Sequence, residues 1–157
     1  MKLLVEKIVN KLRKKKLTIS VAESFTGGLL SSSLTLIPNA SKIYTLGLVT
    51  YSNKSKSKLL KVPKKILTKY GSVSKETCIS MVRNLSKLAK TDISISTTGI
   101  AGPSGGTPAK PVGLVYVGVK IRRKIICKKL LMKGKSRNFI QKETVKKTLR
   151  LIPSLIN

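Results

Sequence analysis

The sequence predicts a three-layer α/β/α sandwich with a mixed β-sheet. Three observations support this fold class. Alternating, strand-like stretches and stretches of helical periodicity follow one another along the 157 residues. Helical stretches stand on both sides of most strands, and a hairpin near the C-terminal end requires antiparallel pairing. Because the chain has ordinary domain length and shows neither a repeat nor a linker, we expect a single domain over residues 1–157.

The first half of the chain is expected to alternate between helix and strand. Apolar residues recur at helical spacing over residues 2–16, and they alternate with polar ones over 17–23. Two glycines then turn the chain into a helix over 29–37, which Pro38 ends. A second strand is expected over 44–51.

The second half is expected to contain helices, a third strand and the hairpin. Serines and a proline stand where N-terminal caps are preferred and so indicate where three of the helices begin. The expected elements are helices over 52–60, 63–71 and 74–90, a strand over 92–98, hairpin strands over 114–121 and 125–131, and a helix that begins near Ser136.

The composition excludes several kinds of catalytic site. The chain has no His, so a Ser-His-Asp triad, a Cys-His dyad and a His-ligated zinc are impossible. With only five acidic residues, neither a paired-carboxylate hydrolase nor a multi-carboxylate metal site is expected. Cys78 and Cys127 form no metal or redox motif and are expected to be reduced thiols of the core.

The charge is strongly positive, with 33 basic residues and a formal net charge of +28. Such a charge attracts any polyanion, but Arg is sparse and Trp is absent, whereas nucleic-acid readers depend on Arg and aromatic side chains. We therefore expect only non-specific binding of nucleic acid. Compositional drift and a functional basic face both remain open as causes of the charge.

No stretch of the sequence predicts a membrane span or a targeting segment. The apolar residues near the N-terminus are interrupted by charges, and no run approaches the roughly 20 apolar residues of a transmembrane helix. A soluble, cytoplasmic protein is expected.

Two glycine-containing loops at the ends of expected strands are candidates for binding an anion, because open α/β sheets bind ligands there. The loop over 24–28 opens a helix, whose free N–H groups favour an anion. The run over 99–113 has five glycines and three prolines, and its successive N–H groups would form an anion nest. An ordinary helix cap and an ordered surface loop are the alternatives. The candidate binding residues are Ser24, Thr26, Gly27 and Gly28 in the first loop, and Gly99, Gly102, Gly105, Gly106 and Lys110 in the second.

A third candidate is a serine nucleophile served by a lysine, the usual substitute base where His is absent. Ser41 lies in a loop before the second strand, Tyr51 at the end of that strand, and Lys56 in the first turn of the next helix. The positive end of the helix dipole and the neighbouring Lys54 and Lys58 disfavour the ammonium form and so lower the pKa of Lys56. Tyr51 would relay a proton or stabilise an oxyanion.

Four motifs in register make the chain resemble the CinA C-terminal domain family, whose stand-alone members are nicotinamide-nucleotide amidases. They occur in the family's order over residues 5–155. The motifs are Ala22–Gly28 (AESFTGG), Gly47–Asn53 (GLVTYSN) with Lys56, Gly71–Ser74 (GSVS), and Thr98–Pro103 (TGIAGP), which continues through Gly105 and Gly106 to Lys110–Gly113 (KPVG).

The resemblance implies an anticodon-binding-domain-like α/β/α fold and a hydrolytic activity. The implied reaction converts nicotinamide mononucleotide to nicotinate mononucleotide and ammonia, without a metal or cofactor. The implied partners are a small phosphorylated pyridine nucleotide and further copies of the same chain. The family's catalytic serine, tyrosine and lysine fall on Ser41, Tyr51 and Lys56, and Thr98 and Arg137 match positions that bind the substrate.

On this interpretation, Ser41 attacks the carboxamide carbon while Lys56 acts as general base, directly or through Tyr51. The substrate phosphate is expected on the helix start at 26–28 or on the nest at 102–106, helped by Arg137. Two alternatives remain. One is a catalytically inactive family member that binds or scaffolds, favoured by Asn39-Ala40-Ser41 where the family usually has Gly-Ser-Ser. The other is a nucleic-acid-associated protein, which predicts one contiguous basic face.

Overall fold

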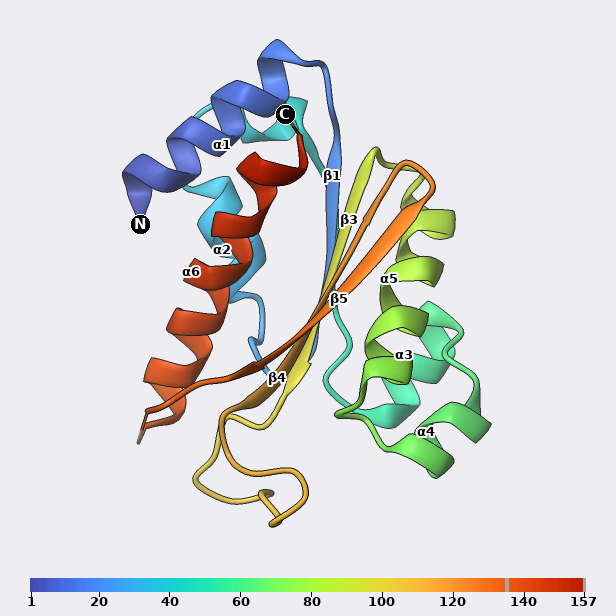
Figure 1. Ribbon diagram of the computed structural model, residues 1–157. Helices are drawn as coiled ribbons and strands as arrows, with labels where there is room; N and C mark the ends of the chain where they lie inside the picture. Colours follow the sequence, from blue (N-terminus) through green and yellow to red (C-terminus); the bar gives the residue numbers. More distant parts are fainter. Residues whose placement is uncertain (135, 157) are drawn as a thin grey trace.

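The computed structural model, which describes residues 1–134 and 136–156, has a five-stranded sheet with helices on both faces (Figure 1). The predicted three-layer α/β/α sandwich is therefore confirmed. The helices are α1 (Lys2–Lys14), α2 (Leu29–Thr35), α3 (Asn53–Leu60), α4 (Lys64–Tyr70), α5 (Lys75–Ala89) and α6 (Arg137–Leu155), and a 3-10 turn, η1, covers Ala40–Lys42. The strands are β1 (Ile19–Glu23), β2 (Tyr44–Val49), β3 (Ile93–Gly99), β4 (Leu114–Ile121) and β5 (Lys124–Leu131).

The sheet is mixed, with strand order β2-β1-β3-β4-β5. β1 pairs in parallel with both β2 and β3, whereas β4 runs antiparallel to β3 and to β5. Because the three parallel strands point the same way, the segments that follow them leave from the same edge of the sheet. These segments are the loop over 24–28, the connection over 50–52 and the long loop that starts after Gly99.

Two helical layers cover the sheet. In Figure 1, α1, α2 and α6 lie against one face, and α3, α4 and α5 lie against the other. The larger core lies under α1, α2 and α6, and the smaller one lies under α3, α4 and α5. Buried residues of the larger core include Ile8, Leu12, Leu30, Ile95, Val117 and Leu149, and those of the smaller one include Ala22, Leu60, Met81 and Leu85.

Side-chain caps begin three helices where the sequence predicts them. Ser52 accepts a hydrogen bond from the Ser55 N–H, Ser74 from the Thr77 N–H, and Ser136 from the Phe139 N–H. Each cap satisfies an N–H that the first helical turn leaves without a partner. The Ser52 cap fixes the start of α3, the helix that carries Lys56.

The first strand begins later than predicted, at Ile19 rather than residue 17. Thr18 is held instead by Asp92, whose carboxylate accepts hydrogen bonds from both the N–H and the hydroxyl of Thr18 at 2.8 Å. These bonds lower the pKa of Asp92 below its ordinary value. The Asp92 carboxylate therefore connects the segment before β1 with the segment before β3, at the end of the sheet opposite residues 24–28.

Candidate active site

A pocket of about 370 Å³ opens at the edge of the sheet where β1 and β3 end. Its walls include residues from the loop over 24–28, from the start of α6 and from the long loop after β3. Its lining residues are Ser24, Phe25, Tyr51, Gly71, Ser72, Val73, Gly99, Ile100, Ala101, Gly102, Ser104, Gly105, Thr107, Lys110 and Arg137.

Lys56 is buried directly behind this pocket, with no exposed surface. Its amino group donates hydrogen bonds to the Ser24 hydroxyl at 2.8 Å, to the Thr50 carbonyl at 2.7 Å and to the Tyr51 carbonyl at 3.3 Å. All three acceptors are neutral, and no carboxylate of the described residues pairs with this amine. Burial without a counter-charge lowers the pKa of Lys56 to about 8. The predicted direction of this shift agrees with the structure, but its cause is burial rather than neighbouring lysines.

Ser24 is the hydroxyl that meets Lys56. It follows β1 immediately: its N–H donates to the Thr97 carbonyl at 3.1 Å, and its carbonyl accepts from the Gly27 N–H at 3.1 Å. The residue is only 7% exposed, and that small surface lines the pocket. A serine hydroxyl within hydrogen-bond distance of an amine of lowered pKa is the arrangement of an activated nucleophile with its base.

Glu23 holds the loop that carries Ser24. The carboxylate is fully buried and accepts hydrogen bonds from the N–H groups of Gly28 at 3.1 Å, Leu30 at 3.0 Å and Ser31 at 2.8 Å. It also accepts one from the Ser31 hydroxyl at 2.6 Å. A carboxylate of this chain therefore fills the N-terminus of α2, where an anion would bind. This role of Glu23 was not predicted from the sequence.

The predicted anion site at residues 26–28 is wrong for that reason. Gly28 gives its N–H to Glu23, and neither Gly27 nor Gly28 lines the pocket. Thr26 is 1% exposed, and its hydroxyl is hydrogen-bonded to the Thr97 hydroxyl at 2.9 Å. These residues shape the turn beneath Ser24, and the N–H groups of Gly27 and Gly28 and the hydroxyl of Thr26 are already hydrogen-bonded within the chain.

The predicted meeting of Ser41 with Lys56 is also wrong. Ser41 is exposed on η1, before β2 begins, whereas Lys56 lies beyond the other end of β2. The six residues of β2 alone separate the two positions by about 20 Å at roughly 3.3 Å per residue. Parallel pairing instead brings the segments that follow β1 and β2 together, and this places Ser24 beside Lys56.

Tyr51 lines the pocket, but it does not relay a proton between a serine and Lys56. Its backbone carbonyl, not its hydroxyl, accepts from Lys56. The hydroxyl accepts a hydrogen bond of 2.6 Å from Arg137, which also donates to the Gly102 carbonyl at 3.2 Å. Tyr51 and Gly102 thus fix the guanidinium of Arg137 at the pocket, as expected for a residue that binds an anionic substrate.

The long loop contributes most of the opposite wall. Gly99, Gly102, Gly105 and Lys110 line the pocket as predicted, and Lys110 donates a hydrogen bond of 2.6 Å to the Tyr70 carbonyl. Ser104 and Thr107 also line it and were not identified from the sequence. The wall thus combines small residues, hydroxyl groups and one cation.

Two predicted site residues of this region lie outside the pocket. Gly106 packs against Val112, where a Cβ atom would come within 2.9 Å of a Val112 methyl group. Thr98 is 1% exposed, and its hydroxyl donates to the Ser72 carbonyl at 2.7 Å. Thr98 therefore positions the loop that contains Ser72 and, contrary to expectation, does not line the pocket.

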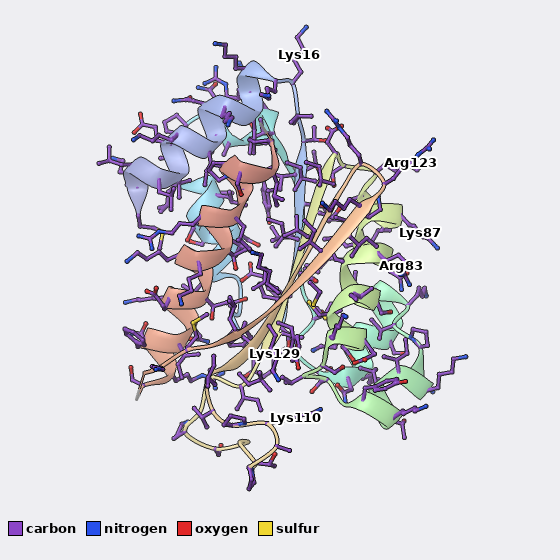
Figure 2. The ribbon with its side chains drawn as sticks, viewed as in Figure 1. Lys16, Arg83, Lys87, Lys110, Arg123 and Lys129 are labelled. Carbon is purple, nitrogen blue, oxygen red and sulfur yellow. The ribbon has the colours of Figure 1, made fainter. Side chains whose placement is uncertain are left out.

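Basic side chains project from several sides of the fold. Figure 2 shows Lys16 after α1, Arg83 and Lys87 on α5, Arg123 in the hairpin turn, Lys129 on β5 and Lys110 in the long loop. These six side chains come from different elements and lie at different places on the fold. The ion pair given by the described residues, Glu143 with Lys146, is long at 4.0 Å.

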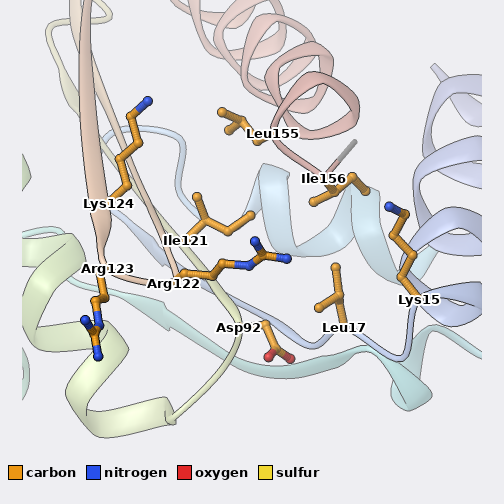
Figure 3. A pocket seen from close by; sticks show the side chains of 9 residues that line it. All are labelled: Lys15, Leu17, Asp92, Ile121, Arg122, Arg123, Lys124, Leu155 and Ile156. Carbon is orange, nitrogen blue, oxygen red and sulfur yellow. The ribbon is translucent and has the colours of Figure 1, made fainter.

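A second cavity of about 360 Å³ lies at the opposite end of the sheet (Figure 3). Arg122 extends across it in the figure, and Lys15, the residue after α1, approaches from the other side. The carboxylate of Asp92, its acidic residue, already accepts two hydrogen bonds from Thr18. The cavity has no hydroxyl or thiol among its lining residues, which are Lys15, Leu17, Asp92, Ile121, Arg122, Arg123, Lys124, Leu155 and Ile156. It therefore offers no serine, threonine, tyrosine or cysteine nucleophile.

Neither metal chemistry nor a membrane span is indicated by the described residues. Among residues 1–134 and 136–156, no group of three or more Cys, Asp or Glu side chains could hold a metal ion. Cys78 and Cys127 are free thiols, the first buried and the second half-buried. Over the same ranges, no helix combines the length and the apolar character that crossing a membrane requires.

Comparison with known proteins gives one consistent result. The sequence model of the CinA C-terminal domain family matches residues 1–156. A CinA-like protein from Kosmotoga olearia is 52% identical over 131 residues, which cover 83% of this chain. The match spans only 32% of that protein, so the chain corresponds to about a third of its length.

Solved structures agree with this result. A competence/damage inducible protein from Agrobacterium tumefaciens superposes with a TM-score of 0.95 at 34% identity, over 99% of this chain and 95% of the other. A CinA superfamily protein from Klebsiella pneumoniae superposes with a TM-score of 0.94 at 26% identity, over 99% and 96%. The resemblance inferred from the four motifs is confirmed.

Proposed function

The chain belongs to the CinA C-terminal domain family, and we propose that it is an amidohydrolase that converts nicotinamide mononucleotide to nicotinate mononucleotide and ammonia. The observation that carries the proposal is the contact of 2.8 Å between Lys56 and the Ser24 hydroxyl. This pair lies at a pocket whose other walls present the cations of Arg137 and Lys110. A nucleophile and anion-binding groups in one pocket suit a phosphorylated carboxamide.

Ser24 is the nucleophile in this mechanism, in place of Ser41. Neutral Lys56 takes the proton of the Ser24 hydroxyl as its oxygen attacks the carboxamide carbon. The resulting ammonium then gives the proton to the amide nitrogen, the carbon–nitrogen bond breaks, and ammonia leaves. Lys56 next deprotonates a water molecule that hydrolyses the ester on Ser24, which releases nicotinate mononucleotide and restores both residues.

Backbone groups next to Ser24 are suited to stabilise the oxyanion. The N–H groups of Phe25 and Thr26 have no acceptor in the described part of the chain. The N–H of the residue after a nucleophile is a common oxyanion donor, and one such donor is worth about 3–4 kcal/mol in the transition state. Gln141 on α6 donates to the Phe25 carbonyl at 2.7 Å and so limits the orientations of this peptide.

The substrate phosphate is assigned to Arg137 and Lys110. The N-terminus of α2 is already occupied by Glu23, which leaves the opposite wall of the pocket. Arg137 is held by Tyr51 and by the Gly102 carbonyl, so its guanidinium needs little ordering when an anion binds. The net charge of +28 adds a long-range attraction for the same substrate.

The test compares two serines. Ser24→Ala is expected to reduce ammonia release from nicotinamide mononucleotide by at least about 10³-fold, because the nucleophile is lost. Ser41→Ala is the matched control and is expected to stay within about twofold of the wild type, since Ser41 is exposed and far from the pocket. A fully active Ser24→Ala protein, or an inactive Ser41→Ala protein that is folded by circular dichroism, would contradict the assignment.

The same assay separates the amidase from the two alternatives. An inactive family member would bind the nucleotide without releasing ammonia, but the intact Ser24–Lys56 contact favours catalysis. A nucleic-acid-associated protein should present one basic face, and the spread of cations in Figure 2 weighs against it.

A further inference from the structure

Two cysteines that are far apart in the sequence lie together in the fold. Cys78 belongs to α5 and Cys127 belongs to β5. Ser96 of β3 pairs with Gly118 of β4, and Gly118 in turn pairs with Cys127. Residues directly opposite each other on paired strands point to the same face of a sheet. Positions 96, 118 and 127 therefore form one row across the sheet.

Cys78 lies over the middle of this row. A Cβ atom on Gly118 would lie 3.1 Å from the Cys78 sulfur, so α5 covers the face to which the row points. The same sulfur lies 3.4 Å from the Ser96 hydroxyl, which donates a hydrogen bond of 2.9 Å to the Cys78 carbonyl. Because Gly118 has no side chain, no side-chain atom at this position separates Cys78 from Cys127. The two thiols are hydrogen-bonded to each other.

The two thiols differ in exposure and in acidity. Cys78 has no exposed surface, and burial raises the pKa of its thiol well above the ordinary value. Cys127 is half-buried and lies on an edge strand. A hydrogen bond from Cys78 lowers the pKa of Cys127 more than partial burial raises it, and the charge of Lys75 lowers it further against a smaller opposing effect of Glu76. Since the thiolate is the reactive form, Cys127 is the nucleophile of the pair.

We propose that Cys78 and Cys127 form a modification site, at which hydrogen peroxide converts the two thiols to a reversible disulfide. The Cys127 thiolate attacks one peroxide oxygen, the oxygen–oxygen bond breaks, and the leaving hydroxide takes up the proton that the thiol lost. Cys127 is then a sulfenic acid. Cys78 loses its proton and attacks the Cys127 sulfur, the sulfur–oxygen bond breaks, and the oxygen leaves as a second water molecule. Two thiols and one hydrogen peroxide thus give one disulfide and two water molecules.

Packing alone does not account for this arrangement. A buried thiol such as Cys78 can serve as a small apolar side chain, but that role needs no second thiol within hydrogen-bond distance on an edge strand. The site also lies close to the candidate active site. Thr77, the residue before Cys78, donates a hydrogen bond of 2.7 Å to the carbonyl of Gly71, which lines the pocket. The disulfide therefore forms beside the helical turn that holds one wall of the pocket.

Thiol counting and mass spectrometry on the whole chain test the proposal. After treatment with hydrogen peroxide, the wild type is expected to lose both of its thiols and two hydrogen masses. Peptide mapping should show Cys78 joined to Cys127 within one chain, and dithiothreitol should restore both thiols. Cys78→Ser should stop at a sulfenic acid on Cys127, which dimedone traps. Cys127→Ser should slow the loss of the Cys78 thiol by at least about tenfold, because a buried thiol of raised pKa reacts slowly.

A displaced pair of thiols is the matched control. The double variant Cys127→Ser, Ile125→Cys keeps two thiols but moves one of them two residues along the same face of β5, by about 7 Å. Cysteines at such a separation cannot be bridged without movement of the backbone. This variant is therefore expected to form no intramolecular disulfide under conditions that oxidise the wild type completely.

Three results would overturn the proposal. The wild type could keep both thiols while its methionines are oxidised, or its cysteines could end as unlinked sulfinic acids or as a disulfide between two chains. The displaced pair could link as fast as the natural pair. Cys78 could also react as fast in Cys127→Ser as in the wild type. None of these measurements uses a nucleotide substrate, so the disulfide and the amidase activity can fail independently.

Discussion

The dependence of turnover on pH tests the role of Lys56 most directly. A general base must be neutral to accept a proton, so the rate follows the neutral fraction of the amine. With a pKa of about 8, roughly one Lys56 in ten is neutral at pH 7, and roughly one in a hundred is neutral at pH 6. At the ordinary value of 10.5, only about one in three thousand would be neutral at pH 7. Burial thus raises the population of the active form by about 300-fold at this pH.

The expected result is a rising profile with a plateau. The kcat for ammonia release from nicotinamide mononucleotide should increase about eightfold from pH 6.5 to 7.5, bend near pH 8 and level off above pH 9. The substrate phosphate titrates near pH 6, so kcat at saturating substrate is compared only above pH 6.5 and at constant ionic strength. Lys56→Arg is the control, because its guanidinium remains charged throughout and should be inactive at every pH.

Two outcomes would refute this reasoning. A flat profile from pH 6.5 to 9 would show that no group with a pKa near 8 limits the reaction. A bend near 10.5 would show that the Lys56 amine is solvated and charged at neutral pH, contrary to its burial. Substantial activity in Lys56→Arg would assign the proton transfer to another group.

Three further changes have expected outcomes of different kinds. Arg137→Ala should raise KM for nicotinamide mononucleotide about tenfold with little change in kcat. It should have much less effect on KM for the riboside, which lacks the phosphate. Equal losses for both substrates would contradict a phosphate contact. Glu23→Gln should lower the free energy of unfolding by about 1–3 kcal/mol in urea titrations and lower kcat, because an amide cannot accept all four hydrogen bonds of the carboxylate. Gly118→Ala should lower the free energy of unfolding by about 1–3 kcal/mol in the same titration. The reason is that the new Cβ would lie 2.6 Å from the Ser96 hydroxyl and 3.1 Å from the Cys78 sulfur. An unchanged midpoint would mean that the sheet shifts freely at this position.

Local signals account for how well the elements could be predicted. Ser52, Ser74 and Ser136 each accept a hydrogen bond at the start of a helix, so a cap in the sequence marks a real boundary. The ends of the strands were predicted less exactly than the starts of these helices, because tertiary contacts determine where a strand begins and ends. Thr18 shows this: its pattern fits a strand, but Asp92, far along the chain, takes its N–H and hydroxyl.

The site was harder to predict because it depends on which segments meet. Lys56 could be identified as a candidate base because the chain has no His and because this lysine lies in the first turn of a helix. Its partner could not be identified from distance along the chain, since Ser41 is closer to Lys56 in the sequence than Ser24 is. Parallel pairing of β1 with β2 puts Ser24 beside Lys56 and leaves Ser41 at the far end of β2. Strand direction alone, combined with the rule that such sheets bind ligands at the ends of their strands, would have favoured Ser24.

In the proposed mechanism, the scarcity of acids explains why a lysine can act as the base. Of the five acidic residues, Glu23 is enclosed by four donors and Asp92 by Thr18, so neither neutralises Lys56. Lowering the pKa of Lys56 from 10.5 to about 8 corresponds to a destabilisation of about 3 kcal/mol at neutral pH, which is a large part of the stability of a typical domain. A carboxylate near Lys56 would relieve that cost, but it would also return the amine to its charged form and remove the base. In the proposed mechanism, the same unpaired burial therefore weakens the fold and activates the serine.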